Sequence, residues 1–132
     1  MNQLANKVVV VTGGSRGIGA AIAKRLAKDG ARVAITYAKN SDAADLVLKD
    51  IKAAGGEAIA LQADARDSEA VKAAIDKVAS TFGRLDVLVN NAGTAIAKPF
   101  EETSFEEMNE VVALNLMGVF VATQAALKHL KK

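Results

Sequence analysis

Apolar residues along the chain follow two alternating patterns. Four short runs, at 7–12, 32–37, 57–62 and 85–89, predict strands, and the first is a β-branched run typical of a strand that is buried on both faces. In the segments that follow these runs, apolar residues recur every three or four positions, which is the spacing of one face of an α-helix. Strands and amphipathic helices therefore alternate through the first two thirds of the chain.

The predicted helices carry suitable capping residues. The first covers about residues 18–29, Ser41 or Asp42 is expected to cap the second, and Asp67 or Ser68 the third. The residues expected to face the core are Ile18, Ile22 and Leu26 in the first helix, Val47, Ile51 and Ala54 in the second, and Val71, Ile75 and Val78 in the third.

The later part of the chain departs from this alternation. A loop containing Pro99, the only proline, follows the fourth run, and Ser104 then caps a final helix that reaches about residue 130 and can bend near Asn115. Strands joined by short helical crossovers form parallel sheets with right-handed connections. We therefore expect one α/β domain over residues 1–132, a Rossmann-like doubly wound sheet in the order 3-2-1-4 that stops after the fourth strand and its helix.

Composition excludes several functional classes. The chain has no cysteine and one histidine, His129, so disulfides, thiolate chemistry and a multi-histidine metal site are excluded and no metal site is predicted. A net charge of +2 without a basic stripe, and 4% aromatic residues, argue against a nucleic-acid partner. The N-terminus lacks the pattern of a signal peptide, and the apolar run 111–122 is too short to cross a bilayer, so we expect a cytoplasmic protein without membrane contact.

A glycine-rich turn separates the first predicted strand from its helix. In this position Gly13 permits the sharp exit from the strand, Gly17 lets a pyrophosphate approach the backbone, and Gly19 lets the helix pack closely. The start of the helix then offers free N–H groups and the positive end of its dipole to phosphate. The turn is predicted to bind a dinucleotide through its residues Thr12, Gly13, Ser15, Arg16, Gly17, Ile18 and Gly19.

The end of the second strand favours NADP over NAD. Sites for NAD place an acidic residue there to bind the ribose 2′-hydroxyl, whereas this chain has Tyr37, with Lys39 close behind and Arg16 in the glycine turn. The two cations would attract a 2′-phosphate that no acid repels. The alternative is that Arg16 and Lys39 are only solvated surface residues.

Polar residues also follow the third and fourth strands. Asp64 could accept a hydrogen bond from an adenine amino group, although an aspartate in a loop is more often a cap or a turn residue. Asn90 and Asn91 precede Ala92 and Gly93, whose small side chains leave room for a ligand. Asn115 is the one polar residue in the run 111–122; if buried there it must be hydrogen-bonded.

These motifs together resemble the short-chain dehydrogenase/reductase family, and most closely its bacterial 3-oxoacyl-carrier-protein reductase-like members. The turn matches the family's Thr-Gly-x-x-x-Gly-x-Gly pattern, and residues 90–93 match its Asn-Asn-Ala-Gly motif. The resemblance implies that Asp64 contacts adenine, that Asn90, Ala92 and Gly93 border the adenosine, and that Asn115 is the one member of the catalytic tetrad in this chain. The family's Ser and its Tyr-x-x-x-Lys pair follow a fifth strand, and neither is found in these 132 residues, where the only tyrosine is Tyr37.

Three hypotheses follow from this sequence. It is an NADP-binding fragment of a reductase that is catalytically incomplete, a half-domain that only folds and self-assembles, or part of an enzyme whose remainder was removed. His129 as a substitute acid is less plausible, because it is expected to lie far from the cofactor. An apolar fourth strand at the sheet edge and an apolar final helix predict a homo-oligomer through one or both of them.

Overall fold

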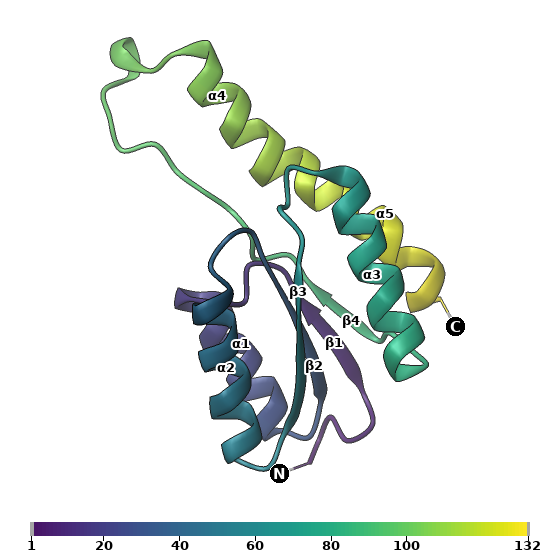
Figure 1. Ribbon diagram of the computed structural model, residues 1–132. Helices are drawn as coiled ribbons and strands as arrows, with labels where there is room; N and C mark the ends of the chain where they lie inside the picture. Colours follow the sequence, from purple (N-terminus) through teal and green to yellow (C-terminus); the bar gives the residue numbers. More distant parts are fainter. Residues whose placement is uncertain (1, 132) are drawn as a thin grey trace.

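The computed structural model describes residues 2–131 and has a four-stranded parallel sheet between two layers of helices (Figure 1). The strand order β3-β2-β1-β4 is the one that the sequence predicts. In chain order the elements are β1 (Val8–Val11), α1 (Gly17–Lys28), β2 (Arg32–Tyr37), α2 (Ser41–Ala53), β3 (Glu57–Gln62), α3 (Ser68–Phe82), β4 (Val87–Val89), the 3₁₀ turn η1 (Phe100–Glu102), α4 (Phe105–Val112), the π-helical segment η2 (Ala113–Met117) and α5 (Gly118–Leu130).

Alternate residues of β1 divide the core into two halves. Val9 and Val11 face α1 and α2, whereas Val8 and Val10 face α3 and α5, and all four side chains are fully buried. A strand covered on both faces has to be apolar at every position, which explains the unbroken run of valines. The backbone N–H of Val8 in β1 donates to the carboxylate of Asp86 at 2.9 Å, and Asp86 directly precedes the edge strand β4.

The sequence located the helices correctly but misplaced some of their core faces. Val71, Ile75 and Val78 of α3 are buried as predicted, whereas Ile18 of α1 is 75% exposed and Ala54 lies exposed beyond the end of α2. In α1 the buried residues are Gly19, Ala23 and Ala27, and in α2 Ala44 joins Val47 and Ile51. Ile22 and Leu26 are partly buried against the same core, so the predicted face of α1 is shifted toward its small residues, which allow the helix to lie close to the sheet.

Two capping and boundary predictions also need correction. Asn40, not Ser41 or Asp42, caps α2 by accepting from the N–H of Ala43 at 3.0 Å. The fourth strand covers only Val87–Val89, although Leu85 before it is 2% exposed. Asp67 caps α3 and Ser104 caps α4, as expected.

The last helical stretch is longer than the apolar run suggests. α4, η2 and α5 are continuous, and this stretch of 26 residues, Phe105–Leu130, has the length and composition of a membrane-spanning helix among the described residues. The prediction that the apolar segment is too short to cross a bilayer considered only the run 111–122 and therefore underestimated its length. The packing of the stretch points to another role, because Ala122 and Ala126 of α5 are buried against the sheet and α3, while α4 extends beyond the sheet (Figure 1).

Candidate nucleotide site

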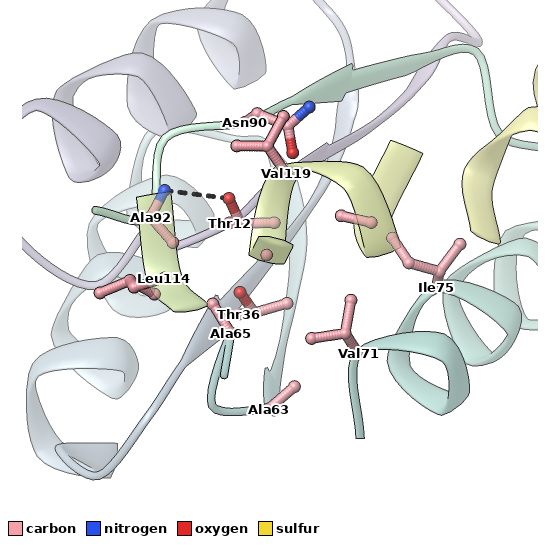
Figure 2. Close-up of a pocket in the computed structure, with 12 residues that line it drawn as sticks. Thr12, Thr36, Ala63, Ala65, Val71, Ile75, Asn90, Ala92, Leu114 and Val119 are labelled. Carbon is pink, nitrogen blue, oxygen red and sulfur yellow. Dashed lines mark hydrogen bonds between the residues drawn. The ribbon is translucent and has the colours of Figure 1, made fainter. Parts of the chain in front are cut away.

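The carboxyl ends of the four strands meet at one edge of the sheet, and the predicted site residues lie in the loops that leave it. In parallel α/β sheets this edge is where ligands bind. The loops after β1 and β4 are joined there by hydrogen bonds. Thr12 Oγ1 accepts from the backbone N–H groups of both Asn91 and Ala92 at 3.0 Å, and Figure 2 shows the bond to Ala92.

Asn91 completes this connection from the other side. Its Nδ2 donates to the carbonyl oxygens of Thr12 and Gly13, each at 3.1 Å. The Asn-Asn-Ala-Gly segment therefore fixes the start of the glycine turn, and Asn91 does this although it was not among the predicted cofactor contacts. Asn90 points the other way, with its Nδ2 donating to Thr123 Oγ1 of α5 at 3.0 Å.

The glycine turn has the backbone geometry that its sequence requires. Gly13 has φ +64°, and its N–H donates to Thr36 Oγ1 at 3.2 Å. Thr36 is 5% exposed, and sequence reasoning missed it, although a threonine in an otherwise apolar buried strand is itself a signal of a specific hydrogen bond.

Gly17 and Gly19 differ in what surrounds them. Gly17 has φ +55°, and a Cβ built on it would have no neighbouring atom within 4 Å, so the backbone there is open to an approaching group. A Cβ on Gly19 would lie 2.3 Å from Gly13 O and 2.4 Å from Asn91 Nδ2, so no side chain fits. The first turn of α1 therefore sits directly against the glycine turn, with Ser15 in the turn itself and Ile18 exposed in the helix's first turn.

Cationic residues lie on the outer side of this edge. Arg16 is the exposed N-cap residue of α1, and its side chain makes no capping bond to the described helix. Lys39 is exposed just beyond β2, behind half-buried Tyr37, and its charge is near enough to lower the pKa of Asp64.

Asp64 follows β3 and is held by a neighbour that the sequence analysis did not consider. Arg66 binds its carboxylate through two side-chain nitrogens, with Nε to Oδ1 at 3.0 Å and Nη2 to Oδ2 at 2.7 Å. These bonds, with smaller contributions that include the charge of Lys39, lower the pKa of Asp64 to about 2 despite partial burial. The carboxylate is therefore ionised and oriented at neutral pH.

Asn115 lies within η2 and pairs with the loop after β4. Its Oδ1 accepts from the N–H of Thr94 at 2.8 Å, and its Nδ2 donates to Thr94 O at 2.7 Å. Asn115 is exposed although it lies in the apolar run, and it is hydrogen-bonded at a local change in helix geometry, where the sequence allowed for a bend. Gly93 lies directly beside it, since a Cβ there would be 3.3 Å from Asn115 Oδ1.

A small cavity of about 10 Å³ lies beneath these loops, lined mainly by small and apolar side chains that include Thr12, Ala63, Ala92, Leu114 and Val119 (Figure 2). Its volume is that of a single water molecule. His129 is distant from this edge, since it pairs with Asp76 of α3 near the end of α5.

The fold and this edge define a Rossmann-like α/β protein of the doubly wound class. The profile of the short chain dehydrogenase family matches residues 7–132, so the chain belongs to that family. It is 50% identical over 98% of its length to an uncharacterized oxidoreductase of Methylorubrum extorquens, of which it covers 52%. It is 44% identical over its whole length to a 3-oxoacyl-[acyl-carrier-protein] reductase of Synechocystis, of which it covers 53%.

Solved structures agree with this assignment. A short chain dehydrogenase of Burkholderia cenocepacia, determined in complex with NADP, has a TM-score of 0.94 and 52% identity over 98% of this chain and 53% of that one. The chain thus spans about half the length of the relatives it matches. The family resemblance predicted from the motifs is confirmed.

Proposed function

We propose that this chain is the NADP(H)-binding half of a short-chain oxidoreductase. The observation that carries the proposal is the glycine turn. Gly17 leaves the backbone open at the start of α1, while Asn91 donates to Gly13 O and Thr36 accepts from the Gly13 N–H, which holds the rest of the turn in place. An open helix N-terminus on a rigid turn is suited to a pyrophosphate. When bound, the nicotinamide cofactor would supply the hydride for reduction of a carbonyl group.

The residues around the edge fit the adenosine half of the cofactor. Asp64 would accept from the adenine amino group, and Asn90, Ala92 and Gly93 would border the adenosine. Arg16 and Lys39 would bind the 2′-phosphate, because both are exposed cations and Tyr37 stands where an NAD-specific site has an acid. The Burkholderia relative that binds NADP supports this preference.

Titration with NADP, NAD, 2′-phospho-ADP-ribose and 2′,5′-ADP tests the cofactor assignment. We expect 2′-phospho-ADP-ribose to bind about as well as NADP in residues 1–132, because the adenosine and pyrophosphate contacts lie within residues 12–93, whereas 2′,5′-ADP, which lacks the pyrophosphate, should bind more weakly. Arg16→Ala and Lys39→Ala should each weaken NADP more than NAD, by about 1–3 kcal/mol for a lost charge-assisted bond. Arg25→Ala is the matched control, since Arg25 is an exposed arginine of α1 that pairs with Asp29 at the far end of the helix. Equal losses for both cofactors would contradict the assignment.

Turnover separates the proposed function from its alternatives. Without a Tyr-x-x-x-Lys pair, residues 1–132 alone should bind nucleotide but show no NADPH-dependent reduction of oxoacyl substrates. A folded chain that self-associates and binds no nucleotide would favour the alternative of a pure assembly module. Turnover that persists through further purification would show that another residue acts as the proton donor.

We also propose that the chain self-associates through the exposed face of its last helical stretch. An apolar stripe runs along α4, η2 and α5 at intervals of three or four residues over most of its length, and consists of Phe105, Met108, Val112, Leu116, Phe120 and Leu127, each at least 40% exposed. Such a continuous apolar surface is characteristic of an interface. Sedimentation at micromolar concentration should give a dimer, and Phe120→Glu should shift it to a monomer that remains folded. A wild-type monomer would refute the proposal.

A further inference from the structure

Arg66 joins two parts of the molecule that are distant in sequence. Its guanidinium binds Asp64 in the loop after β3 and, through Nη1, the carboxylate of Glu110 on α4. Because α4 extends beyond the sheet, this ion pair is a link between the helix and the edge where the candidate nucleotide site lies (Figure 1).

The hydrogen bonds of the Asp64 carboxylate determine which oxygen remains available. Oδ1 accepts twice, from the backbone N–H and the Nε of Arg66, both at 3.0 Å, whereas Oδ2 accepts only from Nη2 at 2.7 Å. Each carboxylate oxygen has about two acceptor positions. Arg66 therefore occupies Oδ1 fully and leaves one acceptor position on Oδ2.

The same loop touches the helical stretch at a second point. A Cβ built on Gly118, at the start of α5, would lie 3.0 Å from Ala65 O, so the loop backbone rests directly on the helix. The contact at Gly118 and the ion pair at Glu110 are eight residues apart on one continuous helix. The helical stretch is also held by the packing of α5, by Asn115 with Thr94 and by Lys98 with Glu107, so the Arg66–Glu110 pair adds the restraint that ties α4 to the loop of Asp64.

We propose that Arg66 is a positioning residue that orients the Asp64 carboxylate for the nucleotide and, through Glu110, couples nucleotide binding to the placement of α4. The inference rests on the proposed function, because it needs a nucleotide at this edge. A ligand that donates a hydrogen bond to Asp64 stabilises the arrangement in which Arg66 also holds Glu110, and the coupling acts equally in both directions.

The solvent exposure of the Arg66 and Glu110 side chains limits the expected change in nucleotide affinity. The side chains of Arg66 and Glu110 are 40% and 57% exposed, and exposed ion pairs contribute little individually. The pairing of Arg66 with Asp64 is bidentate, however, and one guanidinium serves both acids, so removal of Arg66 frees both at once. A change in affinity of about fivefold is therefore expected, not a complete loss of binding.

The test compares Arg66→Ala, Arg66→Lys and Glu110→Gln in the intact protein that carries this sequence, with 2′,5′-ADP as the probe. Arg84→Ala is the matched control, because Arg84 makes the same bidentate pair with an aspartate two residues away, Asp86, at the opposite end of the sheet. Dissociation constants, hydrogen exchange of residues 105–112 with and without 2′,5′-ADP, and the ¹³C titration of the Asp64 carboxyl are measured for each.

In the unsubstituted protein, 2′,5′-ADP should slow exchange in α4. Arg66→Ala should weaken binding about fivefold, raise the titration midpoint of Asp64 and abolish the protection of α4. Arg66→Lys should recover only part of each effect, because an ammonium group cannot form the bidentate pair. Glu110→Gln should abolish the protection of α4 while weakening binding less, and Arg84→Ala should change none of these quantities.

The outcomes distinguish a failure of the proposed nucleotide binding from a failure of the coupling through Arg66. If the unsubstituted protein does not bind 2′,5′-ADP, the proposed function fails. If it binds and Arg66→Ala binds equally well, or if α4 gains the same protection in every variant, the function stands and the coupling through Arg66 is refuted.

Discussion

Gly19→Ala should destabilise the protein even though it replaces glycine by the best helix former. Gly19 lies in the first turn of α1, where alanine is ordinarily preferred by about 1 kcal/mol. In this structure its Cβ would lie 2.3 Å from Gly13 O and 2.4 Å from Asn91 Nδ2. The first of these neighbours is backbone, so the clash cannot be relieved by rotating a side chain.

The expected magnitude follows from the contacts that have to move. Separating α1 from the glycine turn is an overpacking strain of about 1–3 kcal/mol. Displacing Asn91 also disturbs its two hydrogen bonds, to Thr12 O and Gly13 O, each worth about 0.5–1.5 kcal/mol. After the gain in helix propensity is subtracted, a net loss of about 2 kcal/mol or more in the free energy of unfolding is expected, together with weaker nucleotide binding.

Urea denaturation and titration with 2′,5′-ADP measure the two effects. Gly118→Ala is the graded control, because its Cβ would lie 3.0 Å from Ala65 O, a contact that needs to yield by only a few tenths of an ångström. This variant should be close to the unsubstituted protein in stability. If Gly19→Ala were as stable as Gly118→Ala, the close approach of α1 to the turn would not be what requires glycine there.

Three further predictions follow from individual contacts. Because the folded-state pKa of Asp64 is about 2, below its ordinary value of 3.8, the contribution of its pair with Arg66 should be fully present above pH 5 and lost as pH falls through 2. The decrease in the free energy of unfolding between pH 5 and pH 2, followed by circular dichroism, should therefore be smaller in Asp64→Asn, by at most about 1 kcal/mol. Asp67→Ala should cost about 1 kcal/mol in urea denaturation, because Asp67 Oδ1 accepts from the N–H of Ala70 at the start of α3. Thr12→Val should cost about 1–3 kcal/mol and increase hydrogen exchange at residues 91 and 92, whose N–H groups lose their acceptor.

The sheet and its order were predictable because several independent signals agree. Buried parallel strands need continuous β-branched runs, short connections need helical crossovers, and residues such as Asp67 and Ser104 mark helix starts by their side-chain chemistry. The glycine turn was predictable for the same reason, since Gly13 and Gly17 have the positive φ angles that favour glycine.

The misplaced face of α1 shows where such reasoning fails. Spacing selects Ile18, Ile22 and Leu26 as one apolar face, and nothing in the spacing says that the sheet lies too close for large residues. In the structure Ala23 and Ala27 are the buried residues and Ile22 and Leu26 are partly buried against the same core, whereas Ile18 is exposed. The distance between layers is a tertiary property that hydrophobic periodicity does not encode.

The role of Arg66 could not be predicted for a related reason. Its partner Asp64 is two residues away, but Glu110 is 44 residues away and reaches it only because α4 continues from α5 past the sheet edge. Asn115 is similar, since its pairing with Thr94 depends on how the loop after β4 returns to the helix. Contacts between loops and a distant helix require the three-dimensional path of the chain, which the local pattern does not determine.

The two kinds of interaction in this molecule have different consequences for function. The core is held by aliphatic packing, with residues such as Val10 and Ile75 fully buried, whereas the carboxyl edge is held by hydrogen bonds between segments distant in sequence, such as Thr12 with Asn91. Aliphatic packing is non-directional, so core substitutions change stability without re-aiming any group at the edge. Hydrogen bonds are directional, so substitutions at the edge alter the position of the groups proposed to bind the nucleotide. Ile75→Val should therefore lower the free energy of unfolding and leave the ratio of NADP to NAD affinity unchanged, whereas Lys39→Ala should change that ratio at nearly constant stability. A change in that ratio in Ile75→Val would show that the edge and the core are not separable in this way.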